Sequence, residues 1–178
     1  DSEYGELYKK GAGYTLTLNQ AVEIMLRESD NTALRAVLET NDQYLPSDVR
    51  ALNSLDIEYD INNTDQTLQI GTRSYSSFFK CLYFACYNSK EDSQKILSIL
   101  GETDFNDRLV SGITDKSVLV SHKIGVFNTV VQSDCGIVYV PNSNYALCIM
   151  IQADDNSTTN SHFKELSKIV YEFIVGAN

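Results

Sequence analysis

The sequence predicts an α+β protein in which a helical part is followed by an antiparallel sheet with flanking helices. Apolar residues recur at helical spacing before residue 118, strand-like segments follow one another over about 118–153, and a last helical stripe closes the chain. With 178 residues the chain can form one domain with a core. We expect a mainly helical part over about 14–115, and strands with a closing helix over about 116–178.

The composition excludes several classes of function. Fourteen Lys and Arg against 24 Asp and Glu give a formal charge of -10, which disfavours binding to nucleic acid. The longest apolar run, Tyr145 to Ile151, is far shorter than the roughly 20 residues of a membrane-spanning helix. The four cysteines form no C-x-x-C pair and the chain has two histidines, so we predict neither a metal site nor a cofactor.

The first two helices are predicted to meet at the sequence RESDNTA. Thr17 and Gln20 form a capping box, so the first helix begins there. A second helix follows from about Thr32. Ser29, Asp30 and Asn31 lie between the two helices, where residues of this kind commonly cap a helix. The predicted buried positions are Leu18, Ala21, Val22 and Met25 in the first helix and Ala33, Ala36, Val37 and Leu38 in the second.

The middle of the chain is predicted to contain three further helices. A short one begins at Pro46 and runs to about Leu55. After it, alternating apolar residues at 57–61 suggest extended chain, and residues 62–66 suggest a polar loop. Ser74 to Tyr87 forms an aromatic helix. The last of the three, about Lys90 to Leu100, ends at Gly101.

Three strands and a helix are predicted to complete the chain. The strands are 118–126, 133–140 and 145–153, with 141–144 turning between the last two. Both faces of the second and third strands are apolar, so helices should cover the sheet on both sides. The closing helix, about 159–175, should bury one stripe made of Phe163, Leu166, Val170 and Phe173.

The cysteines are predicted to be free, buried thiols. Cys81 and Cys86 are five residues apart on one predicted helix and so point in different directions. Cys135 and Cys148 share a face of a predicted hairpin. If Asn142 and Ser143 centre the turn, however, these two cysteines are diagonal rather than direct neighbours.

Three motifs occur in a fixed order along the chain. Gly13-Tyr14-Thr15-Leu16 precedes a helix that leads to Ser29-Asp30-Asn31-Thr32-Ala33. The second motif comes much later and is Val120-Ser121-His122-Lys123-Ile124-Gly125. The third follows it and is Asp134-x-Gly136-Ile137-Val138-Tyr139-Val140-Pro141. This order resembles the S-D-N and K-T-G motifs of class A β-lactamases and penicillin-binding proteins, over nearly the whole chain. S-D-N alone is a weak signal, because a helix cap explains it as well.

The resemblance implies roles for five residues. In this family a serine nucleophile attacks the carbonyl of a β-lactam or a D-alanyl cell-wall peptide and forms an acyl-enzyme. Ser29 would relay a proton to the leaving nitrogen, and Asn31 would hold the substrate amide. Lys123 would face the substrate carboxylate and Ser29. Gly125 would keep its strand open to close approach, and the backbone N–H of Val126 would bind the oxyanion. An extracytoplasmic location, in a bacterial envelope or secreted, follows from the same resemblance.

Two departures from the family pattern change this expectation. Ile124 replaces the threonine whose hydroxyl would bind a substrate carboxylate. No S-x-x-K nucleophile motif precedes Ser29, and the strings that begin at Ser77 and Ser161 lie downstream in predicted helices. We therefore expect the C-terminal part of a β-lactamase-like domain, with the first strands and the nucleophile outside this chain and no activity for the chain alone.

Three alternatives stay open at this stage. Glu58 loosely matches a deacylation base in an E-x-x-L-N loop, although a solvent-facing carboxylate is the simpler interpretation, and His122 is expected to be structural. The chain could instead be a catalytically silent module that binds cell-wall peptide or a protein partner, which Ile124 favours and Ser29, Asn31 and Lys123 oppose. An incomplete domain would expose a sheet edge and the last helix, so a second chain or segment could complete it.

Overall fold

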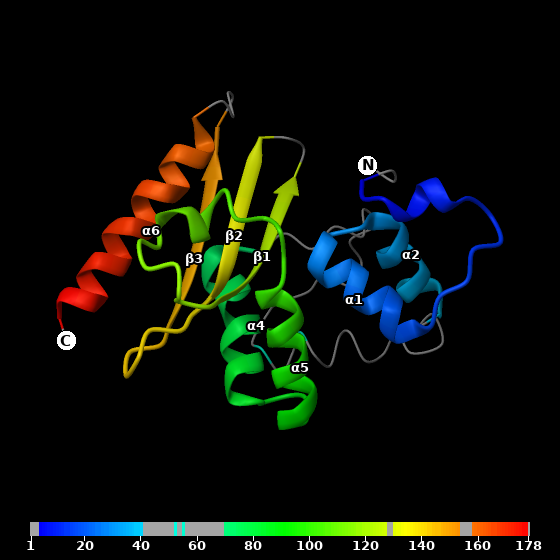
Figure 1. Ribbon diagram of the computed structural model, residues 1–178, viewed down its shortest axis with the longest axis horizontal. Coiled ribbons are helices and arrows are strands. Elements are labelled where there is room, and N and C mark those ends of the chain that lie inside the picture. The colour runs from blue at the N-terminus through cyan, green and yellow to red at the C-terminus, as the bar shows by residue number, and fades with distance from the viewer. Residues whose placement is uncertain are drawn as a thin grey trace.

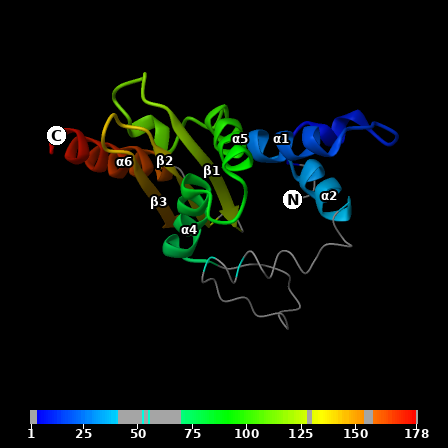
Figure 2. The ribbon, with the colours of Figure 1, turned by 90° about the horizontal axis from the view of Figure 1, so that it is seen from below.

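The computed structural model describes residues 4–40, 52, 55, 70–127, 130–153 and 158–177. Within them, a three-stranded antiparallel sheet carries helices on both faces (Figure 1). Two N-terminal helices lie to one side, next to α5 (Figure 2). None of the described helices is long and apolar enough to cross a membrane. The elements predicted over 46–66, together with Glu58, fall outside the described residues, save for single positions.

The two N-terminal helices confirm the predicted start and junction. α1 spans Leu18–Glu28 and α2 spans Asn31–Thr40. Thr17 Oγ1 accepts a hydrogen bond from Gln20 N at 3.3 Å, and Gln20 Oε1 accepts one from Thr17 N at 2.9 Å, so the capping box is present. The buried side of α2 is narrower than predicted. Ala33 is buried, but Ala36 and Leu38 are exposed.

The aromatic helix α4, Thr72–Phe84, ends before the predicted Tyr87. Ala85 adopts the left-handed conformation with φ 51° and turns the chain back. Ala85 N donates to Leu82 O at 3.2 Å and Cys86 N to Cys81 O at 3.0 Å, the two hydrogen bonds of a Schellman cap. α5, Lys90–Gly101, then follows, with Ser89 as its N-cap.

This turn makes the prediction for the first cysteine pair wrong. Cys81 and Cys86 form a disulfide, and their Cα atoms are 5.0 Å apart. The prediction assumed an uninterrupted helix, in which residues five apart point in different directions. In the Schellman cap the residue after the left-handed position returns over the last turn of the helix. Cys86 is therefore brought next to Cys81.

The strands are β1 (Val120–Phe127), β2 (Val131–Val138) and β3 (Tyr145–Gln152), in the order β1-β2-β3. Val138 pairs with Tyr145, so Cys135 pairs directly with Cys148 and the two form a disulfide. The predicted diagonal placement and free thiols were therefore wrong. The β2–β3 turn is centred one residue earlier than predicted, because Ser143 N donates to Val140 O at 2.9 Å.

Helices cover both faces of the sheet, as predicted. On one face α4 and α5 form a core that contains Phe79, Leu97, Leu100, Cys135 and Ile137. On the other face the short helix η3, Leu109–Gly112, and α6, Thr159–Gly176, form a second core. It contains Leu109, Ile113, Val120, Val138, Val140 and Tyr171. Successive side chains of a strand point to opposite faces, so Lys123 lies on the α4/α5 face with its register partner Cys135.

The closing helix α6 buries a different stripe from the predicted one. Phe163 is fully buried, but Leu166 is exposed and Phe173 is 73% exposed. The buried residues are Thr159, Phe163, Ser167 and Tyr171. The helix docks on η3 through small residues. Ser167 Oγ donates to Leu109 O at 2.7 Å, and a Cβ on Gly112 would lie 2.4 Å from Lys164 O. This close approach turns Leu166 and Phe173 outward.

Candidate functional site

The junction between α1 and α2 places Ser29 by local backbone geometry. Ser29 follows the last residue of α1 in the left-handed conformation, with φ 56° and ψ 29°. The next residue, Asp30, is 1% exposed and caps α2, since its Oδ1 accepts a hydrogen bond from Ala33 N at 2.9 Å. RESDNTA is therefore a helix cap, and that cap sets the direction of the Ser29 side chain.

A second set of contacts fastens the N-terminal segment to this junction. Asp30 Oδ2 accepts hydrogen bonds from Glu6 N and Leu7 N, both at 2.8 Å, at the start of the short helix η1, Leu7–Lys10. Gly5 has φ +109°, and a Cβ there would lie 2.1 Å from Asp30 Oδ2. Asn31 N donates to Tyr4 O at 2.9 Å. This role of Asp30 and Gly5 was not predicted from the sequence, because nothing in the local pattern pairs residues so far apart.

Lys123 reaches Ser29 from the sheet, across 94 residues of sequence. Lys123 Nζ donates a hydrogen bond to Ser29 Oγ, and it also lies 3.4 Å from Ile124 O. On the same face, Tyr75 of α4 donates its hydroxyl to Lys123 O at 3.0 Å. Burial raises the pKa of the Tyr75 hydroxyl above its usual range, so the hydroxyl remains a donor in alkaline solution as well as at neutral pH. The structure thus brings together two of the predicted site residues.

Burial of the ammonium group lowers the pKa of Lys123 to about 8. The charge of Asp134 opposes this shift and the charge of Arg108 adds to it. A lysine with this pKa carries its proton at pH 7 yet gives it up more readily than an ordinary lysine does. Through Ser29 Oγ it can therefore supply a proton to a neighbouring atom and recover one afterwards.

Replacing Lys123 by methionine is expected to stabilise the fold at pH 7 by about 2 kcal/mol, a value reduced for the part of Lys123 that stays in water. Below pH 8 the folded and unfolded chains both bind the proton, so the cost of burying the charge is fully present. Between about 8 and the ordinary value of 10.5 the unfolded chain binds more protons, so the wild type gains stability with rising pH.

Urea unfolding of both proteins from pH 7 to 11 measures this difference. The advantage of Lys123→Met should shrink above pH 8 and vanish above about 10.5. Lys95→Met, at an exposed position on α5, serves as the control and should show no such trend. A variant of Lys123 that is less stable than the wild type at pH 7 would refute the argument.

The remaining predicted site residues lie on α2 and β1. Asn31 begins α2 and is half-buried. Gly125 follows Lys123 on β1, where a Cβ would lie 2.6 Å from Ser133 Oγ, and Val126 is 56% exposed. Ile124 is buried on the opposite face of β1 from Lys123. The substrate-binding roles of Asn31, Gly125 and Val126 stay predictions.

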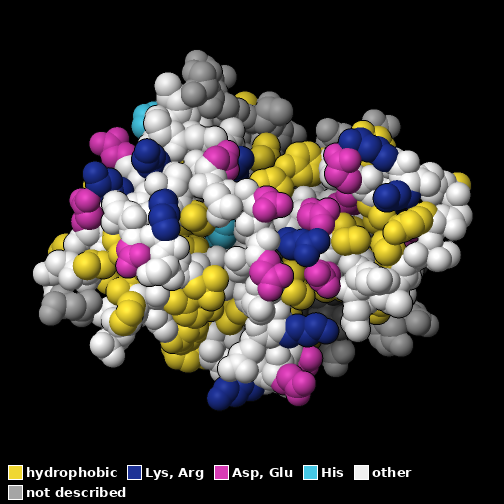
Figure 3. All heavy atoms as spheres, in the orientation of Figure 1, with side chains coloured by type: hydrophobic (Ala, Val, Ile, Leu, Met, Phe, Trp, Pro, Cys, Tyr) yellow, Lys and Arg dark blue, Asp and Glu magenta, His cyan; other side chains and the backbone are white. Residues whose placement is uncertain are grey.

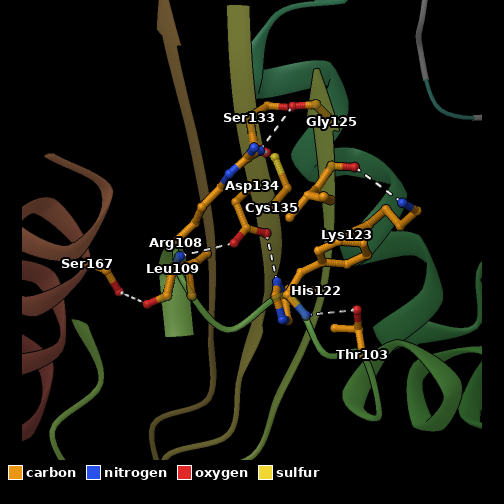
Figure 4. A network of polar contacts seen from close by, with 12 residues as sticks. Thr103, Arg108, Leu109, His122, Lys123, Gly125, Ser133, Asp134, Cys135 and Ser167 are labelled. Carbon is orange, nitrogen blue, oxygen red and sulfur yellow. Dashed lines mark hydrogen bonds and ion pairs between the residues drawn. The ribbon is translucent and has the colours of Figure 1, made fainter. Parts of the chain in front are cut away.

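A buried polar network lies behind Lys123 on the η3/α6 face of the sheet (Figure 4). His122 Nδ1 and Asp134 Oδ1 are 2.8 Å apart, and both side chains are buried. Leu109 N donates to Asp134 Oδ2 at 3.0 Å. Arg108 Nη1 donates to backbone carbonyls of β1 and β2. Sequence reasoning did not find Arg108, although a charge directly before the apolar pair Leu109-Val110 was a signal that it is buried.

The two S-x-x-K strings lie in helices. Ser77 of α4 donates to Arg73 O at 3.1 Å, and Lys80 is exposed. Ser161 opens α6, on the other face of the sheet from Lys123, and donates to Thr158 O at 2.6 Å. Each serine thus has a carbonyl partner in its own helix or helix end. We identify neither as a nucleophile.

Comparison with known proteins gives the family. A model of the "Beta-lactamase enzyme family" matches residues 1–174. PBP-A has 20% sequence identity and a TM-score of 0.80, with 97% of this chain and 66% of PBP-A covered. A variant of the "last common ancestor of Gram-negative bacteria beta-lactamase class A" has 19% identity and a TM-score of 0.80, with 99% and 71% covered. A β-lactamase from Sphaerobacter thermophilus has 16% identity and a TM-score of 0.79, with 96% and 68% covered.

These structures share the α+β fold of this chain, which spans about two thirds of their length. A further structure of PBP-A, a mutant, is an acyl-enzyme complex with penicillin G. No curated protein matches the chain in sequence. The fold confirms the predicted class, and the family model confirms the predicted resemblance. The chain belongs to the beta-lactamase enzyme family.

Proposed function

We propose that these 178 residues are the C-terminal part of a β-lactamase-like serine hydrolase whose nucleophile lies outside them. The observation that carries this proposal is the hydrogen bond from Lys123 to Ser29, which joins the S-D-N segment to the K-I-G strand. In this proposal residues 14–115 and 116–178 form the helical and sheet parts of one domain. The substrates are β-lactams or D-alanyl cell-wall peptides, and the reaction proceeds through an acyl-enzyme.

Each residue has a definite task in this reaction. The oxygen of a serine supplied from outside the chain bonds to the substrate carbonyl carbon, its hydroxyl proton passes to a general base of the same outside segment, and the bond from that carbon to nitrogen breaks. Ser29 gives its hydroxyl proton to the leaving nitrogen and receives one from Lys123, and Lys123 then recovers a proton from that base. Asn31 orients the substrate amide, Gly125 leaves room for the substrate beside β1, and Val126 N–H binds the oxyanion. The acyl-enzyme that PBP-A forms with penicillin G supports the substrate class.

The purified chain should neither hydrolyse a chromogenic cephalosporin nor be labelled by a fluorescent penicillin, because no nucleophile is in place. Intact-mass measurement after incubation should show only the unmodified chain. The result that contradicts the proposal is a stable acyl adduct. Peptide mapping would then decide between Ser29, Ser77 and Ser161, and the corresponding alanine variant would confirm the assignment.

A silent module that binds cell-wall peptide or a protein partner is the second candidate. Ile124 favours it, since its side chain is buried and offers no hydroxyl to a substrate carboxylate. The two candidate functions predict different sequences before these residues in the full gene product. An S-x-x-K motif some tens of residues before Ser29 supports the hydrolase, and its absence supports the silent module.

We propose that a second chain or segment completes the fold by binding at the β3 edge of the sheet. β3 is an edge strand in the described sheet and carries no charged residue. The helix α6, which contacts β3, carries exposed apolar side chains, namely Leu166, Ile169, Phe173 and Val175. Figure 3 shows apolar side chains among charged ones over this part of the molecule. We propose this surface as the place where the missing part of the domain docks.

We also propose an extracytoplasmic location, in a bacterial envelope or secreted. Two disulfides support it, because such bonds form and persist in oxidising compartments. Reaction of the denatured chain with a thiol reagent, before and after reduction, tests this. Protein isolated from its natural host should show no free thiol before reduction and four afterwards.

A further inference from the structure

Arg108 connects the two strands behind the Lys123 site. Its Nη1 donates to Ser133 O at 2.9 Å and to Gly125 O at 3.2 Å. Gly125 and Ser133 are register partners, so one side-chain nitrogen joins β1 to β2 at a single position (Figure 4). That position is two residues beyond Lys123.

The backbone of β1 around Lys123 is held from both faces of the sheet. Ser133 Oγ lies 3.4 Å from Gly125 O and adds a second donor to the carbonyl that Arg108 binds. From the α4 face, the Tyr75 hydroxyl donates to Lys123 O. Lys123 has a flexible four-carbon stem, so the strand beneath it must be fixed if its ammonium group is to meet Ser29 reproducibly.

Arg108 is itself firmly placed. It is 8% exposed, and its guanidinium carbon lies 5.6 Å from the centre of the Phe163 ring of α6. The next residue, Leu109, is fixed by Asp134 through its N–H and by Ser167 through its carbonyl. Arg108 Nε is buried without a hydrogen-bond partner among the described residues. Burying a charged group that lacks some of its hydrogen-bond partners costs free energy of folding. A gain in stability therefore does not explain an arginine at this position.

We propose that Arg108 is a positioning residue, which clamps β1 to β2 so that Lys123 is held against Ser29. The proposal rests on the assignment of Lys123 to the functional site. It goes beyond that assignment because Arg108 contacts neither Ser29 nor the side chain of Lys123. Arg108 acts through the Gly125 carbonyl.

The ionisation of Lys123 reports on this clamp. Few charged or titratable groups surround Lys123 among the described residues. Ser29 faces it from the α1–α2 junction and Tyr75 from α4. Asp134 and Arg108 act on it from the other face of the sheet. Cys135 and Cys148, which share its face, are bonded to each other and do not titrate.

NMR titration of lysine side chains in the full 178-residue chain tests the proposal, with Lys123→Met used to assign the signal. Lys123 should titrate near 8 in the wild type. Arg108→Lys keeps the positive charge but loses the planar fork, so β1 should loosen and Lys123 should become better hydrated. Its midpoint should then rise toward the ordinary 10.5. Arg108→Gln should raise the Lys123 midpoint further, since the repulsive charge is also lost. Ser133→Ala should raise it less than Arg108→Lys does.

Arg35→Lys, at an exposed position on α2, is the matched control and should leave the Lys123 midpoint unchanged. A merely structural Arg108 would lower the melting temperature without moving this midpoint. The proposal is overturned if folded Arg108→Lys titrates at Lys123 like the wild type, even if Arg108→Gln does not, because loss of the charge alone raises the midpoint in the glutamine variant. An unshifted Lys123 near 10.5 in the wild type would instead remove the functional assignment on which the proposal rests.

Discussion

Replacing Asp30 by alanine is expected to lower the free energy of unfolding by about 4 kcal/mol. Its carboxylate accepts hydrogen bonds from three backbone N–H groups, those of Glu6, Leu7 and Ala33. Alanine leaves all three donors without this acceptor, and the N–H of Ala33 is buried away from water while those of Glu6 and Leu7 are part-buried. The change removes the cap of α2 and releases the N-terminal segment together. Urea denaturation followed by circular dichroism measures the loss.

Two variants calibrate this result. Asp30→Asn keeps one acceptor oxygen for Ala33 N but turns an NH₂ group toward the N–H groups of Glu6 and Leu7, so an intermediate loss is expected. Asp92→Ala, at an exposed carboxylate in the first turn of α5, should cost about 1 kcal/mol or less. A loss below 1 kcal/mol for Asp30→Ala would show that the three hydrogen bonds do not hold the junction.

Gly136→Ala is expected to be the other severe change, with a loss of about 3 kcal/mol or more. A Cβ at this position would lie 2.5 Å from Ser121 O and 2.6 Å from His122 Cβ. The first of these atoms is backbone, so β1 must move away from β2 beside Lys123. Besides the loss of stability, we expect the Lys123 titration midpoint to rise as the strand separates.

Gly101→Ala is the matched control for this glycine. Its added Cβ would approach the flexible end of Leu119 at 3.1 Å and would lie at ordinary contact distance, 3.5 Å, from Ser121 Oγ. The residue is the last of α5, and a helix favours alanine over glycine. Thermal unfolding should therefore place Gly101→Ala within about 1 kcal/mol of the wild type. Equal melting temperatures for the two glycine variants would contradict the close approach of β1 and β2.

The order and type of the elements could be predicted because local patterns specify them. The capping box at Thr17 and Gln20 sets the start of α1, and apolar runs between turn residues set the strands. The disulfides could not be predicted in this way. Each depends on one turn, a left-handed Ala85 in the first case and a turn centred on Pro141 and Asn142 in the second. A shift of one residue in a turn changes every cross-strand partner.

Some residues of the candidate site could likewise be predicted from the sequence and others could not. Ser29 and Lys123 could be paired from the sequence only because a family resemblance links two distant motifs, and the structure brings them into contact. Asp30 looked like one polar residue among three, yet its burial makes it structural. Arg108 carries no motif, and its contacts are with backbone carbonyls, whose positions no side-chain pattern reveals.

Binding of penicillin G to the isotope-labelled chain, followed by NMR, tests the central claim most directly. If Ser29, Asn31 and Lys123 form the substrate side of a β-lactamase-like site, their signals and that of Gly125 should shift in a saturable way while the mass of the chain stays unchanged. Lys123→Met should remain folded and lose these shifts. The account would be contradicted if penicillin G left these four residues unperturbed, or shifted Ser29, Asn31 and Gly125 equally in Lys123→Met.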